Sequence, residues 1–249
     1  MTPSELVERF RVRSYEVDPE SRLRIVTLCR MLQEAAWQHA NLLGKGFIDR
    51  DEGGLFWVLS RLRMRISRYP RWGDEFSITT WPVGTNGIFA IRDFRLSDAS
   101  GILGSATSAW LIIDGGSGRP RRPQALVDDI ITQPGEFQGE VERLAAPVNP
   151  VSGPTGAVQL HDIDQYQHVN NTAYLEWMTD AIDALVRRQL LNSGPEVICS
   201  LSMDFLKELT LGAEYRTAVS RSGFETRCDI ISSSDGQTIC RAHLITDDR

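Results

Sequence analysis

The same order of secondary structure is predicted twice along the chain, and this doubling constrains the fold more than any other feature. Apolar residues recur at three- and four-residue steps over residues 28–43 and again over residues 173–186, which predicts a long helix in each half. Each helix is followed by four runs of alternating apolar and polar residues, the pattern of strands with one buried face. A helix followed by consecutive antiparallel strands is an α+β arrangement, so we expect an α+β protein with two similar halves.

The boundaries of these elements follow from where each pattern starts and stops. We expect helices near residues 27–43 and 171–191. The expected strands are residues 10–13, 60–67, 75–81, 88–96 and 102–113 in the first half, and residues 197–205, 213–220, 226–231 and 237–246 in the second. Residues 132–156 are rich in Pro and Gly and lack a periodic pattern, which predicts a linker. The prediction is therefore an N-terminal domain (1–132), a linker (133–156) and a C-terminal domain (157–249).

Composition and charge narrow the class of protein. With 41% hydrophobic and 24% charged residues, the 249-residue chain is an ordinary globular protein. A net charge of −6 disfavours a general nucleic-acid or anionic-membrane role. No apolar run approaches the ~20 residues that span a bilayer, and the first residues lack the pattern of a signal peptide. The four cysteines form no metal-ligand or redox motif, which favours reduced, buried thiols and a cytoplasmic location.

A cluster of titratable residues directly precedes the second helix. Residues 161–171 read HDIDQYQHVNN, so Asp164 and His168 arrive just before Asn170 and Asn171, either of which can cap the helix. The free backbone N–H groups of a helix start carry partial positive charge and suit a developing oxyanion. A carboxylate, an imidazole and free amides in one volume fit acyl transfer or hydrolysis.

Two other interpretations of this cluster stay open. Asp164 could simply satisfy helix amides, with His168 as an ordinary polar residue, because caps are common. A metal site of His161, Asp164 and His168 is less favoured, because no HExxH-like spacing places ligands on one helix face. Glu208, at the end of a predicted strand, would by itself be read as a solvated residue. The chain has no GxSxG elbow, P-loop or GxGxxG motif, and no cysteine in a nucleophile setting.

Several dispersed motifs connect the chain to a known family. In the first half they are Arg13-Ser14-Tyr15-Glu16-Val17, Leu32-Gln33-Glu34-Ala35-Ala36, Phe56-Trp57-Val58-Leu59-Ser60-Arg61, Tyr69-Pro70-Arg71-Trp72-Gly73-Asp74 and Ala106-Thr107-Ser108-Ala109-Trp110. In the second half they are Asp162-Ile163-Asp164, His168-Val169-Asn170-Asn171 and Tyr174. With these motifs the chain resembles the acyl-acyl carrier protein (acyl-ACP) thioesterases. The resemblance implies two tandem hotdog domains, each a long helix wrapped by an antiparallel sheet. It further implies one active site, in the second domain, and an acyl-chain and specificity role for the first.

The catalytic positions of the family transfer unevenly. Asp164 and His168 match its motif, whereas Tyr166 occupies the position of an asparagine. The segment around Glu208 resembles a Glu-Cys pair of the plant members, but Leu209 replaces the cysteine. A cysteine nucleophile is therefore not expected at this position.

The resemblance and these departures favour direct attack by an activated water. Glu208 is the first choice as general base, and Asp164 would fix the water or the imidazole. His168 would bind the thioester or protonate the departing thiolate. The residues expected to contact substrate are Tyr166, Asn170, Asn171 and Trp57. Asp164 as the base or as a nucleophile is the alternative, because simpler hotdog thioesterases use an acid at that position.

The expected function is hydrolysis of fatty acyl-ACP to free fatty acid and ACP, without a metal or cofactor. An acyl-CoA thioesterase, a hotdog protein that binds an acyl thioester without cleaving it and, less favoured, a hotdog hydratase are the alternatives. Because ACP is acidic, a basic docking face is expected, formed by Arg61, Arg63 and Arg65 or by Arg119, Arg121 and Arg122. A solvated strand face explains the first set equally well. The protein is expected to be a monomer or homodimer that neither binds nucleic acid nor inserts into membranes.

Overall fold

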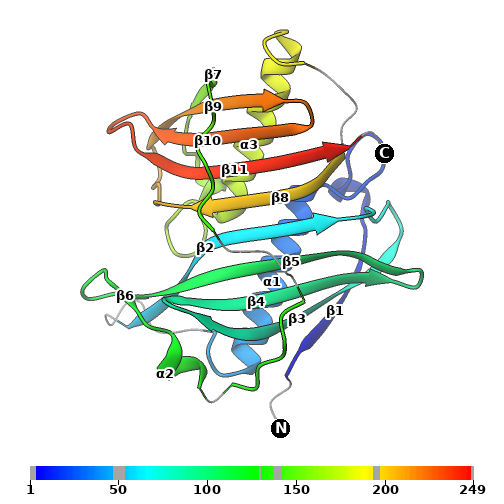
Figure 1. Ribbon diagram of the computed structural model, residues 1–249, viewed down its shortest axis with the longest axis vertical. Coiled ribbons are helices and arrows are strands. Elements are labelled where there is room, and N and C mark those ends of the chain that lie inside the picture. The colour runs from blue at the N-terminus through cyan, green and yellow to red at the C-terminus, as the bar shows by residue number, and fades with distance from the viewer. Residues whose placement is uncertain (1–3, 47–53, 129, 137–141, 193–196, 248–249) are drawn as a thin grey trace. The chain divides into compact units, whose positions relative to one another are not determined.

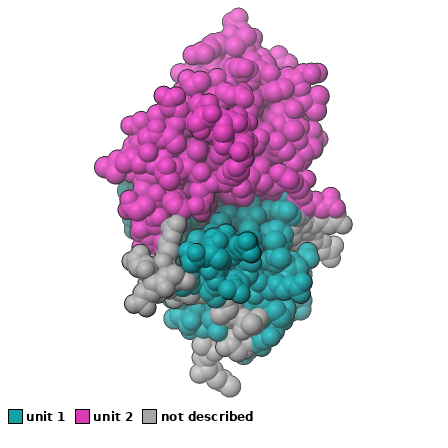
Figure 2. Space-filling model, turned by 90° about the vertical axis from the view of Figure 1, so that its left-hand side faces the viewer, with its two compact units in different colours: residues 1–141 teal, residues 142–249 magenta. Residues whose placement is uncertain are grey.

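Residues 4–46, 54–128, 130–136, 142–192 and 197–247 are described by the computed structural model of the chain. The chain divides into two units, Met1–Val141 and Glu142–Arg249 (Figure 2). The division falls inside the linker expected at residues 133–156. Among the described residues, none of the helices has the length and apolar character needed to cross a membrane.

The first unit is one long helix packed on an antiparallel sheet (Figure 1). Its elements are β1 (Leu6–Arg11), a 3₁₀ turn (Ser14–Glu16), α1 (Ile25–Leu42), β2 (Leu55–Ile66), β3 (Glu75–Asn86), β4 (Phe89–Asp98), β5 (Gly101–Asp114), β6 (Pro120–Arg121) and α2 (Gln124–Val127). Within this unit the strands lie in the order β1-β3-β4-β5-β2, with β6 paired to β5. The β3–β4, β4–β5 and β5–β2 neighbours are antiparallel.

The second unit repeats this plan. Its elements are β7 (Val151–Ala157), a 3₁₀ turn (Leu160–Asp162), α3 (Asn171–Arg187), β8 (Val197–Phe205), β9 (Glu214–Ser222), β10 (Glu225–Ser232) and β11 (Thr238–Asp247). The strand order β7-β9-β10-β11-β8 corresponds, strand for strand, to β1-β3-β4-β5-β2 of the first unit. The α+β architecture with a doubled helix-and-sheet plan is therefore confirmed.

Each long helix forms because its apolar residues share one face. On α1 the buried side chains include Leu28, Leu32 and Ala35, at the three- and four-residue steps that bring side chains together. Inward side chains of the sheet, such as Phe94 and Leu96 on β4, are buried as well. Truncation of one such leucine to alanine costs ~2–5 kcal/mol. Burial of the apolar face, more than intrinsic propensity, holds both helices.

The linker differs from its prediction at both ends. Residues 151–157 form β7 and pair with β9, although residues 151–156 were expected to belong to an irregular linker. Earlier in the linker, the Glu136 N–H donates to the buried Asp93 carboxylate of β4 at 2.8 Å. In the second unit, the Leu144 N–H donates to the buried Asp204 carboxylate of β8 at 2.8 Å. The described parts of the linker are thus bonded to the sheet of their own unit.

Candidate active site

The HDIDQYQHVNN stretch folds into a tight turn that leads directly into α3. Ile163 and Val169 form an isolated antiparallel bridge, and the Asp164 N–H donates to the His168 carbonyl at 2.9 Å. Gln167, at the tip, has a φ of 64°, a left-handed conformation that side-chain-bearing residues seldom adopt. The turn therefore returns the chain so that His168 lies beside Asp164 along the backbone.

His168 is in contact with Glu208, which lies forty residues later in the chain. Its Nδ1 lies 2.6 Å from Glu208 Oε2. Glu208 follows the end of β8, and the next residue, Leu209, is held by two hydrogen bonds. The Val169 N–H donates to the Leu209 carbonyl at 3.1 Å, and the Leu209 N–H donates to the Tyr174 hydroxyl at 3.2 Å. Glu208 is thus fixed against the start of α3.

The contact determines which imidazole nitrogen carries the proton. An ionised carboxylate can only accept hydrogen bonds, so Nδ1 of His168 carries the proton that Glu208 accepts. In the neutral imidazole Nε2 then keeps its lone pair. The His168 side chain is 22% exposed and that of Glu208 47% exposed, so water and substrate can reach the pair.

Asp164 belongs to the same neighbourhood. Its Oδ1 accepts the Tyr166 N–H at 2.8 Å. The pKa of Tyr174 is raised above its ordinary value, mainly by burial and additionally by the negative charges of Glu208 and Asp164. The negative charges of the two carboxylates thus act on the same group, the Tyr174 hydroxyl.

The start of α3 leaves one backbone donor available. Asn170 caps the helix as expected: its Oδ1 accepts the Thr172 N–H at 2.9 Å, and its carbonyl accepts the Ala173 N–H at 2.9 Å. The Asn171 N–H meets no acceptor in the part of the chain that the structure describes. Of the helix amides expected to donate to an oxyanion, the Asn171 N–H is therefore the candidate. The Asn170 side chain is already used in the cap.

Tyr174 is a supporting residue that sequence reasoning recognised only as part of a motif. Replacement by Phe leaves the buried Leu209 N–H without its acceptor, which costs ~1–3 kcal/mol. We expect Tyr174→Phe to lower the melting temperature by several degrees and to lower kcat, because Glu208 adjoins the released segment. Tyr15→Phe, at a residue 67% exposed in the first unit, is the control. An unchanged melting temperature for Tyr174→Phe would contradict this role.

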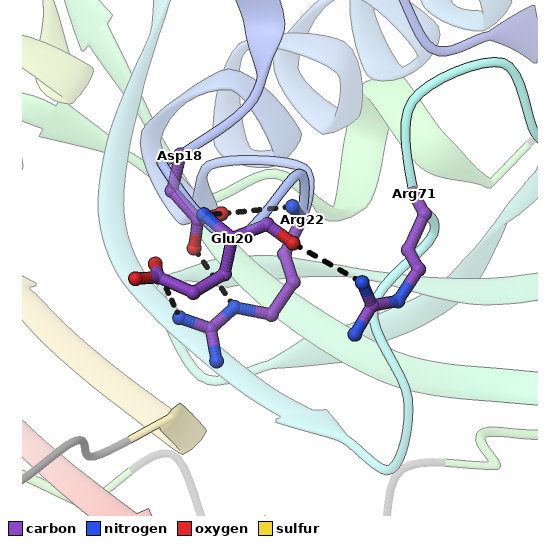
Figure 3. Close-up of polar contacts among 4 residues, drawn as sticks. All are labelled: Asp18, Glu20, Arg22 and Arg71. Atoms are coloured by element: carbon purple, nitrogen blue, oxygen red, sulfur yellow. Dashed lines mark hydrogen bonds and ion pairs between the residues drawn. The ribbon is translucent and has the colours of Figure 1, made fainter.

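The first unit carries the same turn before its helix, with different chemistry (Figure 3). Val17 and Leu23 form the matching bridge, and Ser21 has the matching φ of 64°. Arg22 stands where His168 stands, and its Nε donates to Asp18 Oδ2 at 2.8 Å.

This first-unit turn keeps an acid, Asp18, at the position of Asp164 but has neither an imidazole nor a carboxylate at the positions of His168 and Glu208. Arg22 also donates to Glu20 Oε2 at 3.1 Å, and Arg71 donates to the Glu20 carbonyl at 3.1 Å. The Leu23 N–H donates to the Pro70 carbonyl, just as the Val169 N–H donates to the Leu209 carbonyl in the second unit. Pro70 therefore corresponds to Leu209, and the residue before it, Tyr69, corresponds to Glu208. A guanidinium stays protonated at ordinary pH, so Arg22 cannot accept a proton as an imidazole does.

The cysteines lie in settings that oppose nucleophilic chemistry. All four are free; Cys29, Cys228 and Cys240 are buried, whereas Cys199, expected to be buried, is half-buried. Burial raises the pKa of Cys29 to about 12 and also raises the pKa values of Cys228 and Cys240. A protonated thiol is a poor nucleophile.

We therefore expect turnover to survive without any one thiol. Single Cys→Ala variants at these four positions should keep most of the parent rate, and alkylation of the folded protein should leave kcat close to its starting value. Loss of activity in one variant whose circular dichroism spectrum and melting temperature match the parent would implicate that thiol in catalysis.

The other residues singled out from the sequence are placed as follows. Trp57 lies on β2 in the first unit, where its Nε1 donates to the Lys45 carbonyl at 2.9 Å. The side chain of His161 is 82% exposed. Across the described residues, no three His, Cys, Asp or Glu side chains gather in a metal-binding arrangement.

The expectation that Arg61, Arg63 and Arg65 form one exposed basic face is wrong. Arg63 is only 5% exposed and donates to the Leu62 carbonyl at 3.0 Å. Arg61 lies over the ring of Phe89, 4.8 Å from its centre. The three arginines lie in one unbroken stretch of the β2–β5 pairing and share a face, but alternation does not predict what covers that face.

A long helix on a five-stranded antiparallel sheet, present twice, defines a double-hotdog protein. Family models for the acyl-ACP thioesterase N-terminal domain and C-terminal domain match residues 4–133 and 155–246. The chain belongs to the acyl-ACP thioesterase family.

Individual relatives agree with this assignment. A chloroplastic palmitoyl-acyl carrier protein thioesterase of Gossypium hirsutum is 30% identical over 97% of this chain and 60% of its own length. An oleoyl-acyl carrier protein thioesterase of Coriandrum sativum is 30% identical over 70% of this chain and 53% of its own length. The chain thus spans about half to three-fifths of these curated relatives.

Solved structures match over nearly the whole chain. An acyl-ACP thioesterase of Bacteroides thetaiotaomicron superposes with a TM-score of 0.83 and 26% identity, covering 98% of both chains. The 12:0-ACP thioesterase of Umbellularia californica gives a TM-score of 0.83 at 24% identity, covering 100% of this chain and 99% of that one, and supports the fold.

Proposed function

We propose that the protein hydrolyses fatty acyl-ACP thioesters to free fatty acid and ACP. The observation that carries this proposal is the 2.6 Å contact between His168 and Glu208 at the start of α3. Family membership supports the thioester as the bond that is cleaved. The turn of the first unit, with Arg22 and Tyr69 at the matching positions, supports catalysis by the second unit alone.

The proposed mechanism is direct attack by water on the thioester carbonyl. His168 Nε2 accepts a proton from the water while Glu208 holds the Nδ1 proton and stabilises the resulting imidazolium. In this arrangement the general-base function depends on two residues, His168 and Glu208, whereas the hypothesis from the sequence assigned it to Glu208 alone. Asp164 holds the turn and orients the water.

The tetrahedral intermediate places negative charge on the former carbonyl oxygen. The Asn171 N–H at the start of α3 donates to this oxygen, a contact worth roughly 3 kcal/mol in comparable sites. The carbon–sulfur bond then breaks, and His168 returns the proton to the departing sulfur. The products are a carboxylic acid and a free thiol, and the imidazole is regenerated neutral.

Substrate contacts outside this centre belong to the same proposal. The first unit receives the acyl chain, with Trp57 near it, and Tyr166 and Asn170 adjoin the thioester. Of the second arginine cluster, Arg121 pairs with Asp114 at 2.8 Å, while Arg119 and Arg122 are exposed and suit an acidic carrier protein. Four free cysteines accord with a reducing compartment such as the cytoplasm.

A panel of acyl thioesters tests this function against its alternatives. Matched acyl-ACP and acyl-CoA substrates of several chain lengths are incubated with the protein, and free thiol is measured. The proposal expects higher kcat/KM with the ACP substrates. Higher kcat/KM with acyl-CoA would favour the CoA thioesterase, and saturable binding of both without thiol release would favour a non-catalytic acyl-thioester binder.

A further inference from the structure

A second charged group, unrelated to His168 and Glu208, lies inside the first unit. Arg92 on β4 reaches the inner face of the sheet and donates through Nη1 to His39 Nδ1 of α1 at 2.9 Å and to Thr80 Oγ1 of β3 at 3.1 Å. His39 and Thr80 are fully buried. Because a guanidinium can only donate, Nδ1 of His39 accepts, and the imidazole is neutral while this bond persists.

The charge on Arg92 has no counter-ion. No carboxylate of the described residues pairs with it, and burial lowers the pKa of Arg92 to about 10, so it is still charged at neutral pH. A half-buried charge without a counter-ion is unfavourable for folding and is seldom kept without a binding or catalytic use.

Both polar and apolar residues lie next to Arg92 in the sheet. Arg92 pairs across the sheet with Pro82 on β3 and with Ser108, which is fully buried, on β5. The next residues along the same face of β4 towards its end are the buried Phe94 and Leu96. This face of β4 thus places a charged group next to apolar side chains, the combination that matches a carboxylate on an aliphatic chain.

One edge of the guanidinium is open. Within the described part of the chain, the hydrogen bonds of Arg92 use Nη1 only, and the side chain keeps some solvent-accessible surface. Nε and Nη2 form the edge that binds a carboxylate through two parallel hydrogen bonds. Arg241 makes such a pair in this same protein: its Nε and Nη2 each lie 2.7 Å from an oxygen of Asp229.

We propose that Arg92 is a specificity-determining residue whose Nε–Nη2 edge binds a carboxylate carried by an aliphatic chain inside the first unit. This inference rests on the proposed function in so far as the first unit receives the acyl chain. The carboxylate has two possible sources: the far end of a dicarboxylic acyl thioester, or the head of a free fatty acid.

The test compares the parent with Arg92→Met, which keeps the length and removes the charge, and Arg92→Lys, which keeps the charge and removes the fork. Arg95→Met, three positions further along β4 and on the opposite face, is the matched control, because Arg95 pairs with Glu136. Thermal melting verifies that each variant is folded. If Arg92→Met does not fold, Arg92→Lys and the parent carry the test.

Calorimetry with dodecanoate and its methyl ester tests the fatty-acid source without requiring catalysis. The parent should bind the acid more tightly than the ester, on the order of tenfold to hundredfold for one charge-assisted pair. Turnover of a thioester with a terminal carboxylate, against the plain acyl thioester of equal length, tests the dicarboxylic source. The inference is supported if, in either experiment, the parent prefers the free carboxylate, Arg95→Met keeps this preference, and Arg92→Met and Arg92→Lys lose it. The experiment that shows the preference identifies the source of the carboxylate.

Parent and Arg92 variants that discriminate equally in both experiments would overturn it, leaving Arg92 an internal structural group. Failure of the proposed function has a different signature. In that case no variant cleaves any thioester. The calorimetry with dodecanoate still shows, independently of turnover, whether binding of the acid requires Arg92.

Discussion

Replacement of Glu208 by Gln is expected to lower kcat by ~10²- to 10⁴-fold, the range for loss of a general-base function. The side-chain amide of Gln can donate an N–H to Nδ1 of His168. The imidazole would then carry its proton on Nε2 and would lose the lone pair that accepts the proton of water. KM should change little, because the proposed contacts to the chain and carrier lie elsewhere. Steady-state thiol release under saturating substrate measures both constants.

Glu225→Gln is the matched control for this variant. Glu225 also faces an imidazole, that of His243, at 3.2 Å in the second unit. Its replacement should leave kcat unchanged. If Glu208→Gln stays within a few-fold of the parent while Asp164→Asn loses the acid limb of the pH–rate profile, then Asp164 is the base and Glu208 a supporting residue.

Replacement of His168 by Ala is expected to lower kcat to a similar extent, because the imidazole both takes the proton from water and returns it to sulfur. The double variant Glu208→Gln/His168→Ala should be no slower than His168→Ala alone, since groups that act as a unit are strongly non-additive. The measurement is a double-mutant cycle on kcat, with His243→Ala as the control. Losses that multiply would mean that the two side chains act independently.

The elements with strong periodicity were predictable from the sequence. The structure has α1, α3, β4 and β5 close to the expected bounds, because burial of one face imposes the pattern in the sequence. Two other strands are longer than expected: β2 begins at Leu55 and not at residue 60, and β3 ends at Asn86 and not at residue 81. Strand β7 was missed, since Gly153 and Pro154 interrupt any alternation and edge strands tolerate them. The short β6 and α2 are too brief to leave a periodic signal.

The candidate site was predictable in part. The residues just before α3 attract attention because titratable groups adjoin a helix start, and Asn170 was identified as a possible cap. The contact between His168 and Glu208 depends on the return of β8 to the start of α3, which no local pattern encodes. The burial of Arg63 and the inward position of Arg92 were hidden for a similar reason: alternation predicts which residues share a face, but not what covers that face.

The most direct test of water attack is a single turnover in H₂¹⁸O, with enzyme in excess over acyl-ACP. The product acid and the peptides that contain Asp164 and Glu208 are then analysed by mass spectrometry. Direct attack predicts one solvent oxygen in the fatty acid and none in either side-chain carboxylate. Incorporation of ¹⁸O into Asp164 or Glu208 would show that the carboxylate itself attacked the thioester, and would contradict the activation of water by His168 and Glu208.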